Sequence, residues 1–87
     1  MEIKATIVKP FLITKEMNEV FAGCVVGLIS DSTGTQTGLD IRTSHVFEYD
    51  INADKSEVVI KTRSGSYYKV IPDSDFIDDL LEYMGDK

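Results

Sequence analysis

Apolar side chains occur at alternate positions in several stretches of the chain, which is the pattern of half-buried β-strands. Alternation begins at Ile3 and ends at Lys9-Pro10, because proline cannot donate a hydrogen bond to a strand ladder. Polar residues 14–19 and 30–38 separate later stretches and predict loops. Strands are therefore expected at residues 3–8 with an apolar continuation at 11–13, and at 20–29, 39–43, 45–51, 58–62 and 66–71.

Residues 20–29 fit two periodicities. Val20, Phe21 and Cys24 belong to a possible helical stripe, but Gly23 and Gly27 would each cost a helix about 1 kcal/mol. In a strand, the same glycines permit the bending that closes a small barrel. We therefore expect a strand, and a helix over 15–29 is the alternative that the periodicity leaves open.

The last two strands should form a hairpin with a three-residue loop. A loop of Arg63-Ser64-Gly65, with Gly65 in the left-handed bulge position, pairs Thr62 with Ser66. It places Ile60 opposite Tyr68 on one apolar face, and leaves lysines on the other. A two-residue loop would shift the register by one residue and bury Lys69, so the longer loop is favoured.

A short amphipathic helix follows the hairpin. Pro72 ends the strand, Asp73 or Ser74 can cap the helix, and Gly85 can end it. The helix would bury one apolar stripe, composed of Phe76, Ile77, Leu80, Leu81 and Met84.

These elements predict a single domain over residues 1–87 that is mainly β (α+β). A polar loop at 53–56 would pair Asn52 with Glu57 and place Phe47, Tyr49 and Ile51 on the same core face as the hairpin. Sequential strands joined by short turns indicate an antiparallel meander. It would form a small SH3-like barrel or a strongly bent sheet, with the helix covering one opening.

The net charge of −6 is concentrated at the C-terminal end. Residues 1–72 contain nine acidic and eight basic side chains, whereas residues 73–87 contain six acidic and one basic. This distribution argues against direct binding of nucleic-acid phosphates and would suit a protein partner with a basic surface. A solvated acidic face that aids solubility is the alternative. The expected partner-binding residues are Asp75, Asp78, Asp79 and Glu82.

A second surface could bind an anion. Basic side chains beside Tyr67 on the outward sheet face can hold an anion or a nucleic-acid strand, or can form a solvated mixed face. The candidate anion-binding residues are Arg42, Lys61, Arg63 and Lys69, with the 31–38 loop for a small molecule or nucleotide. That loop lacks the lysine and hydroxyl that end a phosphate-binding Walker loop.

Catalytic and metal-binding constellations are not apparent, and we expect no enzyme activity, cofactor or metal. His45 lacks the neighbouring nucleophile or co-ligands that catalysis needs. Cys24 lies in an apolar run and is expected in the core. A single cysteine favours a reducing cytoplasm. No apolar run is long enough to span a membrane, and the first ten residues do not resemble a signal peptide.

Two segments together resemble small phage- and prophage-encoded β-domain proteins. These have a G-x-x-I-x-T-S-x-V strand followed by a T-x-S-G-S-x-Y hairpin. The matching residues here are Gly38, Ile41, Thr43, Ser44, Val46, Thr62, Ser64, Gly65, Ser66, Tyr68 and Val70. The resemblance covers about a third of the chain and does not include the acidic helix. It implies a compact β-domain of a kind that often binds and inhibits host proteins, in the host cytoplasm.

The leading hypothesis is therefore a non-enzymatic protein-binding domain, specifically a phage-encoded inhibitor of a host defence, replication or transcription factor. A small-molecule or nucleotide-binding protein and a structural subunit of a homo-oligomer are the alternatives.

Overall fold

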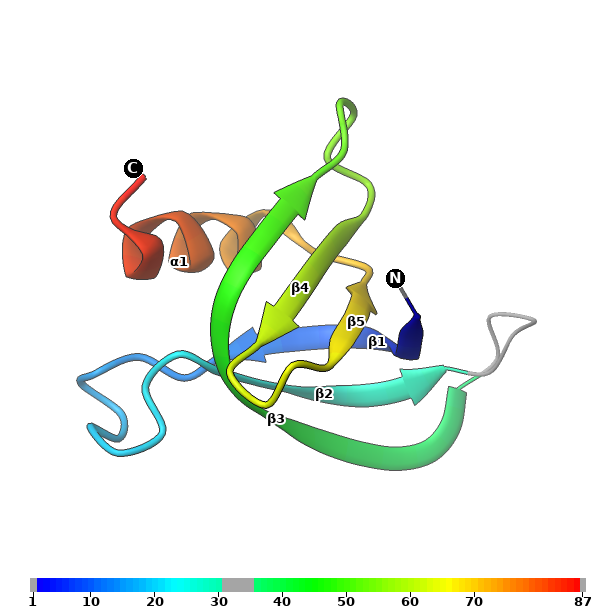
Figure 1. The fold of residues 1–87 in the computed structure, drawn as a ribbon, viewed down its shortest axis with the longest axis horizontal. Helices are drawn as coiled ribbons and strands as arrows, with labels where there is room; N and C mark the ends of the chain where they lie inside the picture. Colours follow the sequence, from blue (N-terminus) through cyan, green and yellow to red (C-terminus); the bar gives the residue numbers. More distant parts are fainter. Residues whose placement is uncertain (1, 31–35, 87) are drawn as a thin grey trace.

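The computed structural model describes residues 2–30 and 36–86. These residues form five strands and one C-terminal helix, which confirms the predicted mainly-β class (Figure 1). The elements are β1 (Ile3–Leu12), β2 (Cys24–Ser30), β3 (Gln36–Ile51), β4 (Val58–Thr62), β5 (Tyr67–Val70) and α1 (Ser74–Met84).

The strands form an antiparallel meander that closes on itself as a small barrel. Each strand pairs antiparallel with the next, from β1 to β5. β5 then pairs with β1 in parallel, through Ala5 with Tyr68 and Ile7 with Val70. Parallel closure follows from the odd number of strands, because alternating directions leave the first and fifth strands running the same way.

β3 is one long strand where the sequence predicted two, at 39–43 and 45–51. Its first part pairs with β2 as far as His45, which lies opposite Cys24, and its last part pairs with β4 from Val46 onward. Because one ladder begins at the residue after the other ends, the backbone at Ser44 stays within the sheet. β3 begins at Gln36, inside the predicted 30–38 loop, and residues 31–35 lie outside the described ranges.

The strand predicted at 20–29 is confirmed over Cys24–Ser30, which form β2, and the alternative helix over 15–29 is wrong. The strand is shorter than predicted, because residues 20–23 form turns. The Asn18 side-chain oxygen accepts hydrogen bonds from the backbone N–H groups of Val20 and Phe21, at 2.9 and 3.1 Å. These bonds use the two backbone N–H groups within a turn, so the groups do not take part in a strand ladder.

The β4–β5 hairpin has the predicted loop and register. The Thr62 N–H donates to the Ser66 carbonyl at 2.9 Å, Ile60 lies opposite Tyr68, and Gly65 has a φ of 88°. The predicted pairing of Asn52 with Glu57 in the β3–β4 hairpin is also confirmed, since the Asn52 N–H donates to the Glu57 carbonyl at 3.1 Å.

Two of the register shifts in the sheet change the predicted pattern of the strands. β1 continues through Lys9-Pro10, where the register shifts between Val8 and Phe11 and Lys9 takes a φ of 50°. A second shift, between Val46 and Glu48, turns Phe47 outward and Val46 into the core. Phe47 is 55% exposed, so its predicted place on the core face was wrong. A β-bulge opposes two residues to one, and this changes which side chain faces inward.

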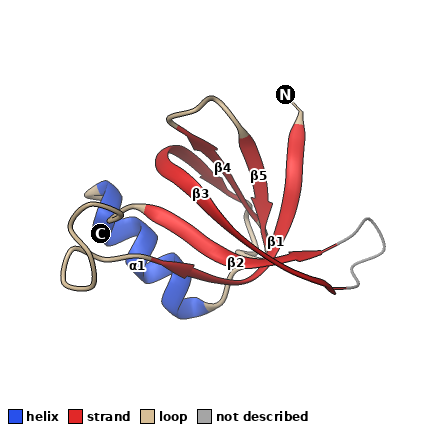
Figure 2. Cartoon of the chain, turned by 90° about the horizontal axis from the view of Figure 1, so that it is seen from below, coloured by secondary structure: helices blue, strands red, loops and turns tan. Residues whose placement is uncertain are grey.

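α1 lies at one side of the barrel and completes its core (Figure 2). Asp73 is the cap, because its side chain accepts a 2.7 Å hydrogen bond from the Phe76 N–H, and Gly85 ends the helix in the left-handed conformation. Phe76, Ile77 and Leu80 are buried in the same cluster as the barrel side chains. Burial of each contributes about 1.5–3 kcal/mol, so this stripe is what attaches the helix.

Candidate functional site

A groove runs along α1 and contains all four acidic residues that the sequence singled out. It is made of two adjoining pockets, of about 440 and 790 Å³, which share Leu12 and Asp79 in their linings. Asp75 and Asp78 line the smaller pocket, and Glu82 lines the larger one. We call the two pockets together the acidic groove.

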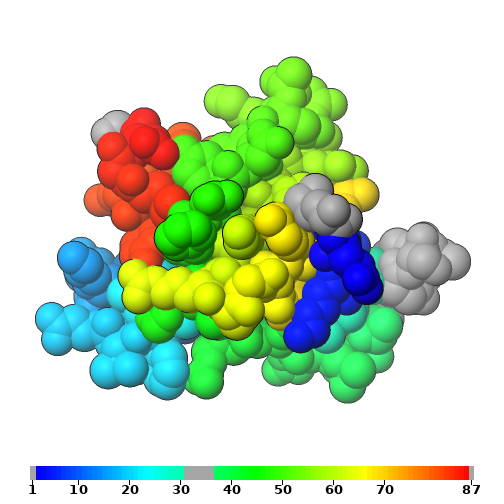
Figure 3. Space-filling model, in the orientation of Figure 1, coloured from blue at the N-terminus to red at the C-terminus, as the bar shows by residue number. Residues whose placement is uncertain are grey.

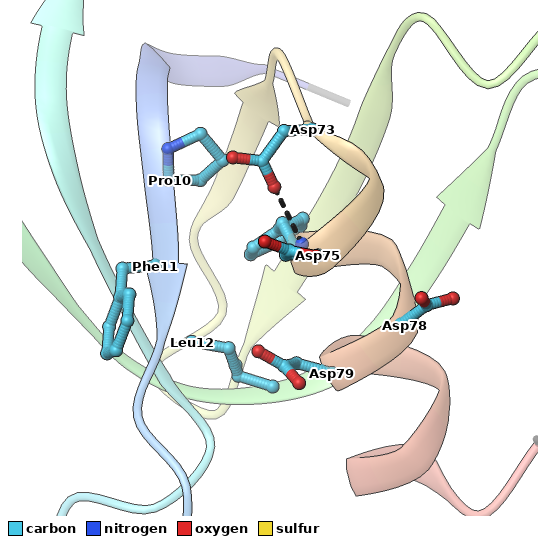
Figure 4. A pocket seen from close by; sticks show the side chains of 8 residues that line it. Pro10, Phe11, Leu12, Asp73, Asp75, Asp78 and Asp79 are labelled. Carbon is cyan, nitrogen blue, oxygen red and sulfur yellow. Dashed lines mark hydrogen bonds between the residues drawn. The ribbon is translucent and has the colours of Figure 1, made fainter.

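The smaller pocket lies between the end of β1 and the first turns of α1 (Figure 4). The Asp79 carboxylate extends from the helix toward Leu12, whereas Asp78 projects from the other side of the helix. Asp73 also lines this pocket, but its side chain is engaged in capping Phe76. Asp75, Asp78 and Glu82 are exposed, and Asp79 is half-buried.

The larger pocket combines charge with exposed apolar surface. The segment after β1 forms one wall and α1 the other, and the two lie side by side in Figure 3 (blue to cyan, and red). Phe47 and Met84 contribute apolar surface, and Lys15 and Arg63 are basic. Over both pockets, six carboxylate side chains and two basic ones line the groove. Its field is therefore negative, and it would attract cationic groups.

The loop that forms the outer wall is fixed at several points. The backbone N–H groups of Met17 and Asn18 both donate to the Thr14 carbonyl at 3.1 Å. The Nε2 atom of His45 lies 3.0 Å from the Val20 carbonyl, so this histidine ties the loop to β3. This contact gives His45 a structural role.

The four candidate anion-binding residues do not form one site. Arg42 lies on the part of β3 that pairs with β2, and its guanidinium is 4.1 Å from the centre of the Phe21 ring. Lys61 and Lys69 share the outward face of β4 and β5, as predicted. Lys69 pairs there with Glu57 at 3.0 Å. Arg63 lines the acidic groove instead. The two lysines are therefore separate from Arg42 and from Arg63, and part of the loop assigned to the same site, 31–35, lies outside the described residues.

Among the residues that the structure describes, three ionisable groups have displaced pKa values. Burial raises the pKa of the Cys24 thiol, and the nearby charge of Arg42 partly opposes this. The hydrogen bond from Tyr49 to Asp86 raises the pKa of that phenol, because it favours the neutral form. Hydrogen bonds from Ser56 lower the pKa of Asp54. None of the three residues lines the groove.

Among residues 2–30 and 36–86, no three His, Cys, Asp or Glu side chains are grouped so as to hold a metal ion. The described part of the chain also has no helix of the length and apolarity that a membrane crossing needs.

Sequence reasoning missed the apolar half of the groove. Phe47, Tyr83 and Met84 line it together with residues 13–16. The exposure of Phe47 depends on the β-bulge beside it, and the sequence around Val46 shows no glycine or proline to mark a bulge. Met84 was assigned to the buried stripe, and the structure leaves it half-buried at the pocket.

Comparisons of the chain with protein-family models, with curated proteins and with solved structures found no match. The chemistry of the groove is therefore the basis for inferring a function.

Proposed function

We propose that this chain is a non-enzymatic protein-binding domain that captures a basic protein partner in the acidic groove. The observation that carries the proposal is the convergence of Asp79, Glu82 and the exposed ring of Phe47 on one pocket. An exposed apolar side chain with a polar rim is typical of a protein-docking surface, and over the whole groove the carboxylates outnumber the basic side chains by six to two. The fitting partner segment presents an apolar side chain with lysine or arginine on either side.

The requirements of folding explain only some of the acidic residues of the groove. Asp73 caps the helix, and Asp75 in the first turn favours it through the helix dipole. Glu82 is near the C-terminal end of α1, where the dipole is negative and where the last turn has no basic residue. A carboxylate there opposes the dipole by about 0.3–1 kcal/mol. Its presence is better explained by attraction of a cationic partner, which also raises the association rate.

The resemblance to phage-encoded β-domains supports a host protein as the partner, met in the host cytoplasm. A domain that covers the basic surface of a defence, replication or transcription factor would block the use of that surface for nucleic acid or other ligands. We therefore propose inhibition of such a host factor as the biological role.

The test is affinity capture from a bacterial lysate with matched charge-reversed variants, followed by mass spectrometry. The groove variant is Asp79→Lys/Glu82→Lys. The control, Glu2→Lys/Asp50→Lys, makes the same change in net charge at exposed positions outside the groove. Loss of close charge pairs costs roughly 1.5 kcal/mol or more, which is about tenfold in affinity.

We expect the groove variant to lose a partner that the control retains. Phe47→Ser should weaken capture as well, with little change in folding because the ring is exposed. Native binding should fall as salt rises, and the residual binding of the groove variant should depend less on salt. Equal capture by the native chain and the groove variant would refute the proposal.

A further inference from the structure

The first part of β3 forms a sheet edge without a second partner strand in the part of the chain that the structure describes. Asp40, Ile41 and Arg42 pair with β2 on one side, between two register shifts of that ladder. Within the described ranges no strand pairs with their other side, because β4 begins its pairing at Val46. Figure 1 shows this part of β3 as the outermost strand at the lower rim of the barrel. An open strand edge presents backbone donors and acceptors to another strand.

Three of the five side chains at 39–43 are exposed, and they include one acid and one base. Leu39 is 63% exposed, and Asp40 and Arg42 are exposed on the outer face of the sheet. Ile41 and Thr43 face inward, toward the barrel core. The short run Leu-Asp-Ile-Arg-Thr therefore has an acid and a base symmetrically placed about Ile41.

We propose that a second copy of this chain pairs antiparallel along residues 39–43, with Ile41 on the two-fold axis. Asp40 of each copy then lies opposite Arg42 of the other, and directly opposed side chains in an antiparallel pair project to the same face. The interface is isologous, so one ion pair is made twice. Leu39 of each copy is placed opposite Thr43 and loses its exposure to water.

The charges also select this register. If the axis moved by one residue, either Asp40 would lie opposite Asp40 or Arg42 opposite Arg42, and like charges directly opposed are destabilising. The edge and the acidic groove have no residue in common, since the groove uses Val46 and Phe47 of β3. Self-association and partner capture are therefore separable, and either can fail alone.

The test uses two single charge reversals, Asp40→Arg and Arg42→Asp. Each variant alone places two like-charged pairs across the axis, and its self-association should weaken about tenfold or more. Mixed together, the two variants regain opposite charges at both positions and should form a heterodimer with near-native affinity. Asp50→Arg, a reversal at an exposed position of β3 outside the edge, is the control and should leave self-association unchanged.

Sedimentation equilibrium with protein up to about 1 mM measures each constant, because an interface this small is weak. Circular dichroism checks that each variant is folded; Asp40→Arg leaves the stacking of Arg42 on Phe21 in place. Two outcomes overturn the proposal. One is a native chain that stays monomeric at the highest concentration, and the other is a mixture of variants that associates no better than either variant alone.

Discussion

Gly23 shows how a single residue positions a wall of the acidic groove. It leads the chain into β2 with a φ of 95°, a conformation that glycine adopts without steric cost. A Cβ atom there would overlap the phenol ring of Tyr83, which lines the groove from α1. Its backbone also donates to the Ile13 carbonyl and accepts from the Val46 N–H, both at 2.9 Å. The loop, the helix and β3 thus meet at a residue with no side chain.

We predict that Gly23→Ala destabilises the fold by roughly 2–5 kcal/mol, from left-handed backbone strain together with overpacking against Tyr83. Gly65→Ala is the matched control, because Gly65 has a similar φ of 88° but open space around it. It should cost only the backbone strain, about 1–2 kcal/mol. Urea unfolding measures both changes. Equal losses in the two variants would show that the contact with Tyr83 adds nothing.

At the scale of elements, sequence patterns predicted the parts whose causes are local. The β4–β5 register follows from Gly65 and from alternation on both strands, and the limits of α1 follow from Asp73 and Gly85. The patterns did not predict features that depend on pairing between strands distant in the sequence. Continuity of β3 through Ser44 depends on two neighbours, β2 before it and β4 after it, and the outward turn of Phe47 depends on a bulge. The acidic wall of the groove was therefore predictable, and its apolar half was not.

The charges of α1 should act oppositely on folding at its two ends. We predict that Glu82→Lys stabilises the fold by about 0.3–1 kcal/mol, because a cation replaces an anion at the negative end of the dipole. Asp75→Lys, in the first turn, should destabilise it by a similar amount. Urea unfolding at low salt measures both effects, and about 1 M salt should suppress them.

Both substitutions remove a carboxylate from the acidic groove, so both should weaken partner capture although they change stability in opposite directions. A fall in capture with Asp75→Lys alone would instead make stability the cause.

At the scale of the whole molecule, α1 is part of the barrel core. Phe76 and Leu80 are fully buried among side chains from several strands, including Ile7, Val25 and Ile60. A domain of this size has a small core and a total stability of about 5–15 kcal/mol. Loss of one large core side chain therefore removes a substantial part of that total. The acidic groove, with one wall on α1, exists only when the whole domain is folded.

We predict that Phe76→Ala lowers the free energy of unfolding by about 3–5 kcal/mol and that the variant still unfolds in one cooperative transition. A chain that ends at Pro72 should not fold into the barrel, because the strands would expose the surface that Phe76, Ile77 and Leu80 cover. Chemical-shift dispersion of backbone amides reports this directly. A dispersed spectrum from the truncated chain would contradict this prediction, because it would show that the barrel folds without α1. Loss of the dispersion would instead show that the barrel folds only together with α1. The carboxylates on α1 are then held at fixed distances from Phe47 on β3, and such fixed distances let the groove recognise a partner by the spacing of its basic and apolar side chains.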